Sequence, residues 1–141
     1  MVEAARLRHP GARFVHADIF TSSPFEPESF DVVFCSGAFN LNLGNNLEFL
    51  PSAVRTMLGL SRRDVVFNLL HRRAATAEAR YYYFDPDDVQ KMLAGLDCQV
   101  RMIDDYLDND FTVICQKKAA GPSQQPAAGN DRPPAGTNGR Q

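Results

Sequence analysis

Two short apolar runs near the start of the chain constrain its fold more than any other feature. Residues 12–20 (ARFVHADIF) reach an acid at Asp18, and residues 30–39 (FDVVFCSGAF) end on a small turn around Gly37. Apolar runs that stop abruptly on acidic or small residues are typical of buried parallel strands that end at a ligand crevice. The sequence therefore predicts strands over residues 14–17 and 31–35, the second of them buried on both faces.

The rest of the chain alternates between helical and strand patterns. Apolar residues at three- and four-residue steps predict a helix over 45–58, and an Asp-Pro-Asp-Asp start predicts another over 85–96. We also expect helices over 1–8 and 74–80, and strands over 64–70, 99–103 and 111–116. Only residues 104–110 join the last two strands. Because a parallel pair needs a dozen or more connecting residues, these two strands should form an antiparallel hairpin.

Composition limits the size of the domain and the kind of partner. The 141 residues suit one domain, and from Ala119 onward they are dominated by Gly, Pro, Ala, Asn and Gln. This predicts a domain over 1–118 and a disordered tail over 119–141. The net charge of −2 argues against a dedicated nucleic-acid binder. We expect neither a membrane span nor a signal peptide, since no apolar run of that kind occurs.

The cysteines give a further expectation about the compartment. Their number is odd and they lack metal-ligand spacing, each lying inside an apolar run at Cys35, Cys98 and Cys115. Such cysteines are typical of reduced thiols in a cytoplasmic protein, and they predict no metal site.

The order strand, helix, strand, helix and closing antiparallel hairpin resembles the second half of a class I S-adenosylmethionine-dependent methyltransferase. The likeness covers about residues 1–117. It implies an α/β, Rossmann-like methyltransferase sheet, with S-adenosyl-L-methionine as cofactor and methyl transfer to a small molecule as function. A nicotinamide-dependent oxidoreductase is the less favoured alternative, because a plain dinucleotide-binding sheet is expected to keep its last strand parallel.

The resemblance also implies roles for individual residues. In that family an acid at the end of the third strand binds the adenine amino group and the next residue holds the ring, and Asp18 and Ile19 match these positions. The end of the fourth strand lies under the cofactor, a place matched here by Ser36, Gly37, Ala38 and Phe39. His71 follows the next strand and is a candidate general base, because its ordinary pKa suits proton transfer near neutral pH.

Each assignment has a structural alternative. Asp18 could cap its own turn, Phe39 could belong to the core, and His71 could lie on the surface beside two arginines. Further candidates are the polar residues Asn40 and Asn68, and the aromatic run 81–84, which forms either a substrate wall or part of the packing on the sheet.

The family's Gly-rich cofactor loop and its ribose-binding acid have no counterpart here, and no GxGxG occurs. We therefore expect weak cofactor binding by this chain alone and an impaired activity. Strand 14–17 could close up beside strand 31–35, another polypeptide could supply the missing strands, or the chain could be an N-terminally truncated gene product, which the pattern favours. A second function stays open: a non-catalytic methyltransferase-like module that associates with itself or a partner chain through its open sheet edge.

Overall fold

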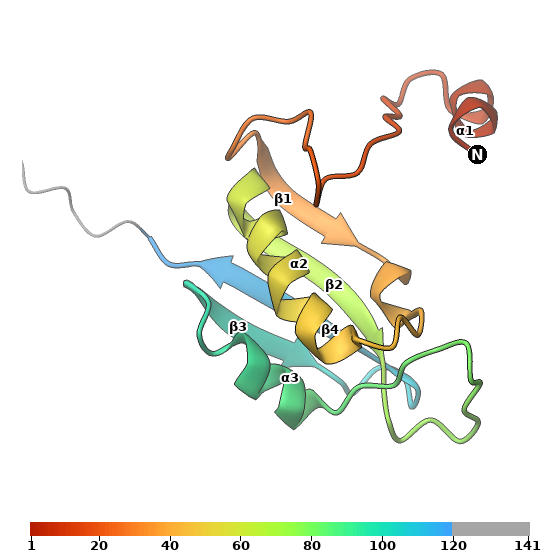
Figure 1. Cartoon of the computed structure of the whole chain (residues 1–141), viewed down its shortest axis with the longest axis vertical. Helices are drawn as coiled ribbons and strands as arrows, with labels where there is room; N and C mark the ends of the chain where they lie inside the picture. Colours follow the sequence, from red (N-terminus) through yellow and green to blue (C-terminus); the bar gives the residue numbers. More distant parts are fainter. Residues whose placement is uncertain (120–141) are drawn as a thin grey trace, which may run out of the picture.

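The computed structural model describes residues 1–119 and consists of one mixed sheet with two helices packed on it (Figure 1). The strands are β1 (Phe30–Cys35), β2 (Ser61–Leu70), β3 (Cys98–Ile103) and β4 (Asp110–Lys117). The helices are α1 (Val2–Arg8), α2 (Asn46–Leu60) and α3 (Pro86–Leu93), with a single 3₁₀ turn, η1, over Ala38–Asn40. Apart from Ala119, the tail predicted from composition lies outside the described residues.

The strands lie in the order β1-β2-β4-β3. β1 and β2 are parallel, with Val33 opposite Val65, and α2 makes the crossover between them. β4 runs antiparallel to both of its neighbours, β2 and β3. The antiparallel hairpin predicted from the short 104–110 connection is therefore confirmed.

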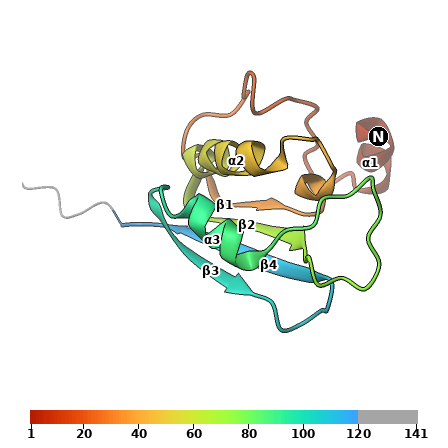
Figure 2. The same cartoon turned by 60° about the horizontal axis from the view of Figure 1, so that its bottom comes forward.

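Helices α2 and α3 cover the same face of the sheet, and the core lies between them and the strands (Figures 1 and 2). Alternate residues of β2 point into this core because side chains of a strand alternate between its two faces. Those of the central strands are fully buried: Val65, Phe67 and Leu69 of β2, and Phe111, Val113 and Cys115 of β4. Helix α3 begins as predicted, with the Asp85 side chain accepting a hydrogen bond of 2.9 Å from the Asp87 N–H.

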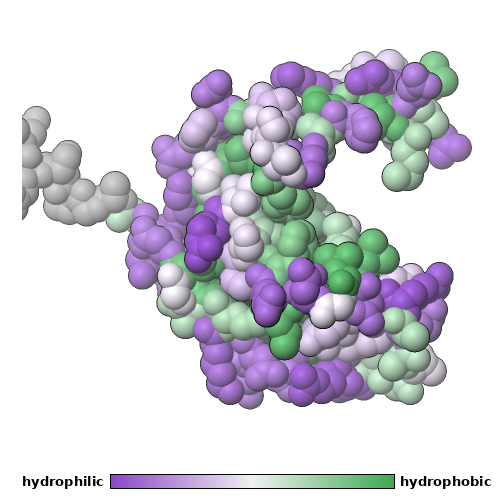
Figure 3. Space-filling view, in the orientation of Figure 1, coloured by the Kyte–Doolittle hydropathy of each residue, from purple (hydrophilic) through white to green (hydrophobic). Residues whose placement is uncertain are grey.

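The opposite face of the sheet is far more open, and the prediction that strand 31–35, which is β1, is buried on both faces is wrong. Val32 and Phe34 of β1 are 43% and 66% exposed, because no described helix covers that face. In the space-filling view a wide gap separates the N-terminal segment from the body of the molecule, with hydrophobic surface along part of the body's side (Figure 3). The outer edge of β1 pairs with no other strand of the described sheet.

Two further predictions of secondary structure are wrong. Residues 14–17 form no strand and have no regular secondary structure, because no strand of the described sheet offers them backbone partners. Residues 74–80 form turns instead of a short helix. Seven residues rarely nucleate a helix without packing, and this loop is held by long-range bonds, among them the 2.9 Å bond from the Asn42 N–H to the Arg80 carbonyl.

None of the helices within residues 1–119 is both long and apolar enough to span a bilayer.

Candidate functional site

The turn after β1 is fixed by a polar network that reaches across the sheet. Gly37 has φ of +75°, a conformation that favours glycine. Its N–H donates to Asn68 Oδ1 at 3.0 Å, and Asn68 Nδ2 donates to Asp110 Oδ2 at 2.9 Å. The hydroxyl of Tyr106 completes the network by donating to Asp110 Oδ1 at 2.6 Å. The network therefore ties the Gly37 turn to the ends of β2 and β4.

Phe39 lies in the core, which was the structural alternative for this residue. Its ring is 4% exposed and packs edge-on against Phe67 at 5.4 Å and Phe49 at 6.2 Å between centroids. The turn formed by Ser36, Gly37 and Ala38 therefore offers mainly backbone to any ligand at this end of the sheet.

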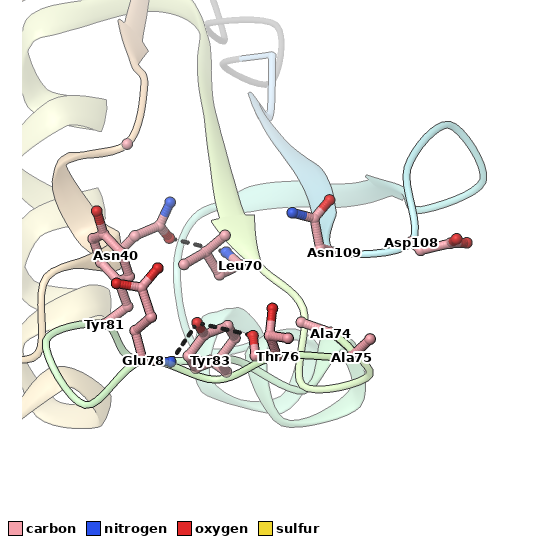
Figure 4. A pocket seen from close by; sticks show the side chains of 11 residues that line it. Asn40, Leu70, Ala74, Ala75, Thr76, Glu78, Tyr81, Tyr83, Asp108 and Asn109 are labelled. Carbon is pink, nitrogen blue, oxygen red and sulfur yellow. Dashed lines mark hydrogen bonds between the residues drawn. The ribbon is translucent and has the colours of Figure 1, made fainter.

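A cavity of about 580 Å³ opens at the carboxyl ends of β1 and β2, beside this turn (Figure 4). We call it the strand-end cavity. Its wall comes from the β1 turn, the end of β2, the 74–83 loop and the β3–β4 hairpin: Gly37, Asn40, Leu70, Ala74, Ala75, Thr76, Glu78, Tyr81, Tyr83, Asp108 and Asn109. The aromatic run thus contributes Tyr81 and Tyr83 to a wall, whereas Phe84 is 1% exposed and belongs to the core.

Asn40 is the best anchored polar side chain of the cavity. It is 6% exposed, and its Oδ1 accepts a 2.9 Å hydrogen bond from the Leu70 N–H. This bond fixes which amide atom is oxygen and leaves Nδ2 as the free donor. No hydrogen bond of Nδ2 is found within residues 1–119. Every fully buried side-chain nitrogen and oxygen there has a partner, so Nδ2 itself must be reached by solvent. Nδ2 is therefore a solvent-accessible donor on a largely buried side chain that lines the cavity.

The other polar groups of the wall are acids and hydroxyls. Glu78 and Asp108 both line the cavity, and no basic side chain does. The hydroxyl of Tyr83 accepts from the Glu78 N–H at 3.0 Å and donates to the Thr76 carbonyl, which braces the loop. Figure 4 shows the side chains of Glu78 and Tyr81 beside Asn40, across the cavity from Asn109. The sequence analysis missed both acids, since an acid in a polar loop carries no distinguishing pattern.

Asp18 and Ile19 lie outside the wall of this cavity. The Asp18 carboxylate caps its own turn, accepting from the Phe20 and Thr21 N–H groups through Oδ1 and from the Thr21 hydroxyl through Oδ2. The Thr21 hydroxyl and then the Phe20 N–H lower the pKa of Asp18, so it is ionised near neutral pH. Ile19 packs against the edge of the core.

His71 is buried, not on the surface, and its imidazole is already used within the chain. It is 9% exposed, lies edge-on to Phe111, and accepts the Arg73 N–H through Nδ1 at 3.1 Å. Burial, followed by the nearby Arg73 charge, lowers the pKa of His71. A neutral ring that accepts at Nδ1 carries its proton on Nε2. In this state His71 can take up a proton only by giving up the Arg73 bond.

Comparison with known proteins agrees with this architecture. Residues 1–59 match the family described as a methyltransferase domain. The chain is similar to a solved structure of magnesium protoporphyrin IX methyltransferase from Synechocystis PCC 6803 with bound S-adenosylmethionine, with a TM-score of 0.58 and 14% identity over 84% of this chain and 55% of that one. It is also similar to a possible histamine N-methyltransferase from Thermotoga maritima, with a TM-score of 0.57 and 12% identity over 84% of this chain and 69% of that one. No curated protein matches the chain in sequence.

The fold is that of a class I S-adenosylmethionine-dependent methyltransferase. The resemblance predicted from the order of strands and helices is confirmed, as is the α/β, Rossmann-like sheet with its antiparallel end. The chain spans 55% and 60% of the length of two solved structures of the Synechocystis enzyme.

Proposed function

We propose that this chain takes part in S-adenosylmethionine-dependent methyl transfer to a small-molecule acceptor. The observation that carries the proposal is the place of the strand-end cavity, at the carboxyl ends of the parallel strands β1 and β2 and beside the Gly37 turn. In open α/β sheets, ligands bind at this end of the strands. The match of residues 1–59 to a methyltransferase domain supports the same reaction class.

For the cofactor we propose Asp18 and Ile19 at the adenine and Ser36, Gly37, Ala38 and Phe39 beneath it, Phe39 acting through its backbone. The chemistry of Asp18 fits this role even though it caps its own turn. An ionised carboxylate has about four acceptor positions, and three are filled by the Phe20 and Thr21 bonds. One position is left for the exocyclic amine of adenine.

When bound, S-adenosylmethionine would supply an electrophilic methyl group; an acceptor oxygen or nitrogen would take it as the carbon–sulfur bond breaks, and the acceptor would give up a proton. The chain's contribution is to hold the acceptor in line and to exclude water, and such positioning supplies much of the rate in reactions of this kind. For His71 we propose support of the 71–73 turn. The alternative is general-base catalysis by His71. It comes second because His71 Nδ1, the nitrogen that would take up the proton, already accepts a hydrogen bond from the Arg73 N–H.

Calorimetric titration of the full chain with S-adenosylhomocysteine tests the proposal. We expect weak, saturable binding that falls about tenfold or more in Asp18→Asn, since a hydrogen bond to a charged group contributes about 1.5–3 kcal/mol. Asp31→Asn is the matched control, an exposed acid paired with Arg62 away from the cavity. The absence of saturable heat from the unmodified chain would overturn the proposal. Equal affinity in Asp18→Asn would remove Asp18 from the adenine site.

We further propose that the open edge of β1 contacts a second polypeptide, a partner chain or another copy. The support is an unpaired edge strand that carries exposed apolar side chains, among them Phe34 at 66%. Sedimentation velocity over a concentration series should show association that Phe34→Lys abolishes. Association without any binding of S-adenosylhomocysteine would instead favour the non-catalytic module. An unmodified chain that stays monomeric throughout would refute self-association.

We propose a reducing, cytoplasmic compartment as the place of action. The support is the state of the three thiols, which are all free and of which Cys98 and Cys115 are buried.

A further inference from the structure

We propose that the strand-end cavity selects, as the methyl acceptor, a small amine that binds as an ammonium ion and releases one proton to solvent before its nitrogen lone pair attacks the methyl group. This inference rests on the proposed function and names the class of substrate. It starts from the charges of the wall: the ionisable acids Glu78 and Asp108 line the cavity without a basic side chain among the lining residues. An anionic acceptor would meet the Glu78 carboxylate, and the cation beside that carboxylate, Arg80, is already paired with it.

The chain itself shows how a cation is held at this wall. The guanidinium of Arg80 bonds to Glu78 Oε2 through Nε at 2.8 Å, and its Cζ lies 4.7 Å from the centroid of the Tyr81 ring. A carboxylate and an aromatic face are the two groups that recognise ammonium and guanidinium ions. Glu78 and Tyr81 therefore already form a cation site, with Arg80 as its internal occupant.

Arg80 holds this position weakly. Its side chain is 68% exposed and that of Glu78 is 57% exposed, and an ion pair this open to water contributes little. The backbone of Arg80, by contrast, is fixed, since its carbonyl accepts the Asn42 N–H. The guanidinium can therefore swing into solvent and leave the loop in place when another cation enters.

Asn40 supplies the second point of recognition, independent of charge. Asn40 is only 6% exposed, and the hydrogen bond from the Leu70 N–H to its Oδ1 holds the side chain in place. Its Nδ2 remains a free donor. A ligand that reaches both groups has an ammonium at Glu78 and Tyr81 and a hydrogen-bond acceptor facing Asn40. The wall is thus matched to a small amine that carries an oxygen or a ring acceptor.

The test uses three probes of one shape and different charge: benzylamine, benzyl alcohol and benzoate. Each is titrated into the ¹⁵N-labelled full chain at pH 7 and followed through backbone amide shifts. We expect benzylamine to shift the amides of Glu78 and Tyr81 and to bind about tenfold more tightly than benzyl alcohol, with weakening in salt. Benzoate binding as tightly as benzylamine would overturn the proposal, and so would no binding of benzylamine.

Variants separate recognition from a merely structural role. Glu78→Gln should weaken benzylamine about tenfold, whereas Arg80→Gln should strengthen it several-fold because it removes the internal competitor. Glu26→Gln and Arg63→Gln change the same charges at exposed positions outside the cavity wall and should have no effect. If benzylamine binds Arg80→Gln as tightly as the unmodified chain or more weakly, Arg80 does not compete for Glu78 and Tyr81, and the proposed cation site is refuted.

A parallel titration with S-adenosylhomocysteine distinguishes the two proposals. Amine binding with the expected variant pattern but no S-adenosylhomocysteine binding means that the cation site is correct and methyl transfer is not. The reverse result leaves methyl transfer in place and removes the amine as its acceptor.

Discussion

The polar network behind the Gly37 turn makes the most specific prediction. Asn68→Ala removes two hydrogen bonds, one to the Gly37 N–H and one to Asp110. Each bond contributes about 0.5–1.5 kcal/mol net. Solvent reaches the exposed Gly37 and partly reaches Asp110, so water replaces part of what is lost. We therefore expect Asn68→Ala to lower the free energy of unfolding by about 1–2 kcal/mol.

Asn68→Asp should cost more than Asn68→Ala, although it is nearly isosteric. The new carboxylate still accepts the Gly37 N–H, but it faces the Asp110 carboxylate where the amide donated at 2.9 Å. Two like charges about 4–5 Å apart after relaxation repel by about 3–4 kcal/mol at an effective dielectric constant of about 20. Asn68→Asp should therefore be less stable than Asn68→Ala.

The double variant Asn68→Asp/Asp110→Asn exchanges donor and acceptor and should restore the pair. Its free energy of unfolding should return to within about 1 kcal/mol of the unmodified chain, since one hydrogen bond is reformed with reversed polarity. Urea unfolding followed by far-UV circular dichroism measures all four proteins, because the chain has no Trp for fluorescence. If Asn68→Asp is no worse than Asn68→Ala, or if the double variant stays as unstable as Asn68→Asp, the network does not hold the turn.

Three further predictions concern the core, a helix cap and pH. Phe67→Ala, at a fully buried ring, should destabilise the fold by about 3–5 kcal/mol in urea unfolding; a cost below about 1 kcal/mol would contradict the packing. Asp85→Ala removes the α3 cap and should cost about 1 kcal/mol, while Asp85→Asn, which keeps the acceptor, should cost little. Because the folded pKa of His71 is lowered, the unfolded chain binds more protons below pH 6.5, so stability should fall as pH falls through that range. His71→Gln should flatten this dependence, and an unchanged slope would refute it.

Local sequence signals predicted the elements that depend on local chemistry. Helix α3 follows from the Asp85 cap and Pro86 at its first position, and both act within one turn of the chain. The closing hairpin follows from the length of the 104–110 connection alone. The start of α3 and the closing hairpin therefore do not depend on how the other elements are arranged.

The errors lie where the outcome depends on distant neighbours. Residues 14–17 have the composition of a strand, but a strand also needs a partner, and none lies beside them in the described sheet. The apolar residues Val32 and Phe34 suggested burial on both faces, yet burial requires a second covering layer. An apolar run therefore indicates only that its side chains favour burial. Whether they are buried depends on how the other helices and strands pack around them.

In the candidate site, too, some residues could be predicted from the sequence and others depend on distant contacts. Asn40 and Asn68 were named as minor polar candidates, and both proved to be anchored by hydrogen bonds near the strand ends. Glu78 was missed because its position is set by the 74–83 loop. Contacts between distant residues hold that loop, such as the 2.9 Å bond from the Tyr82 N–H to the Asn40 carbonyl. No periodicity in the sequence reports such contacts.

Amide shift mapping with S-adenosylhomocysteine tests most directly whether one nucleoside ligand contacts both the turn capped by Asp18 and the Gly37 turn at the end of β1. In the ¹⁵N-labelled full chain, Asp18, Ile19 and Gly37 should shift together along a single saturation curve. Shifts confined to one of the two segments, or separate curves for each, would contradict a shared ligand site.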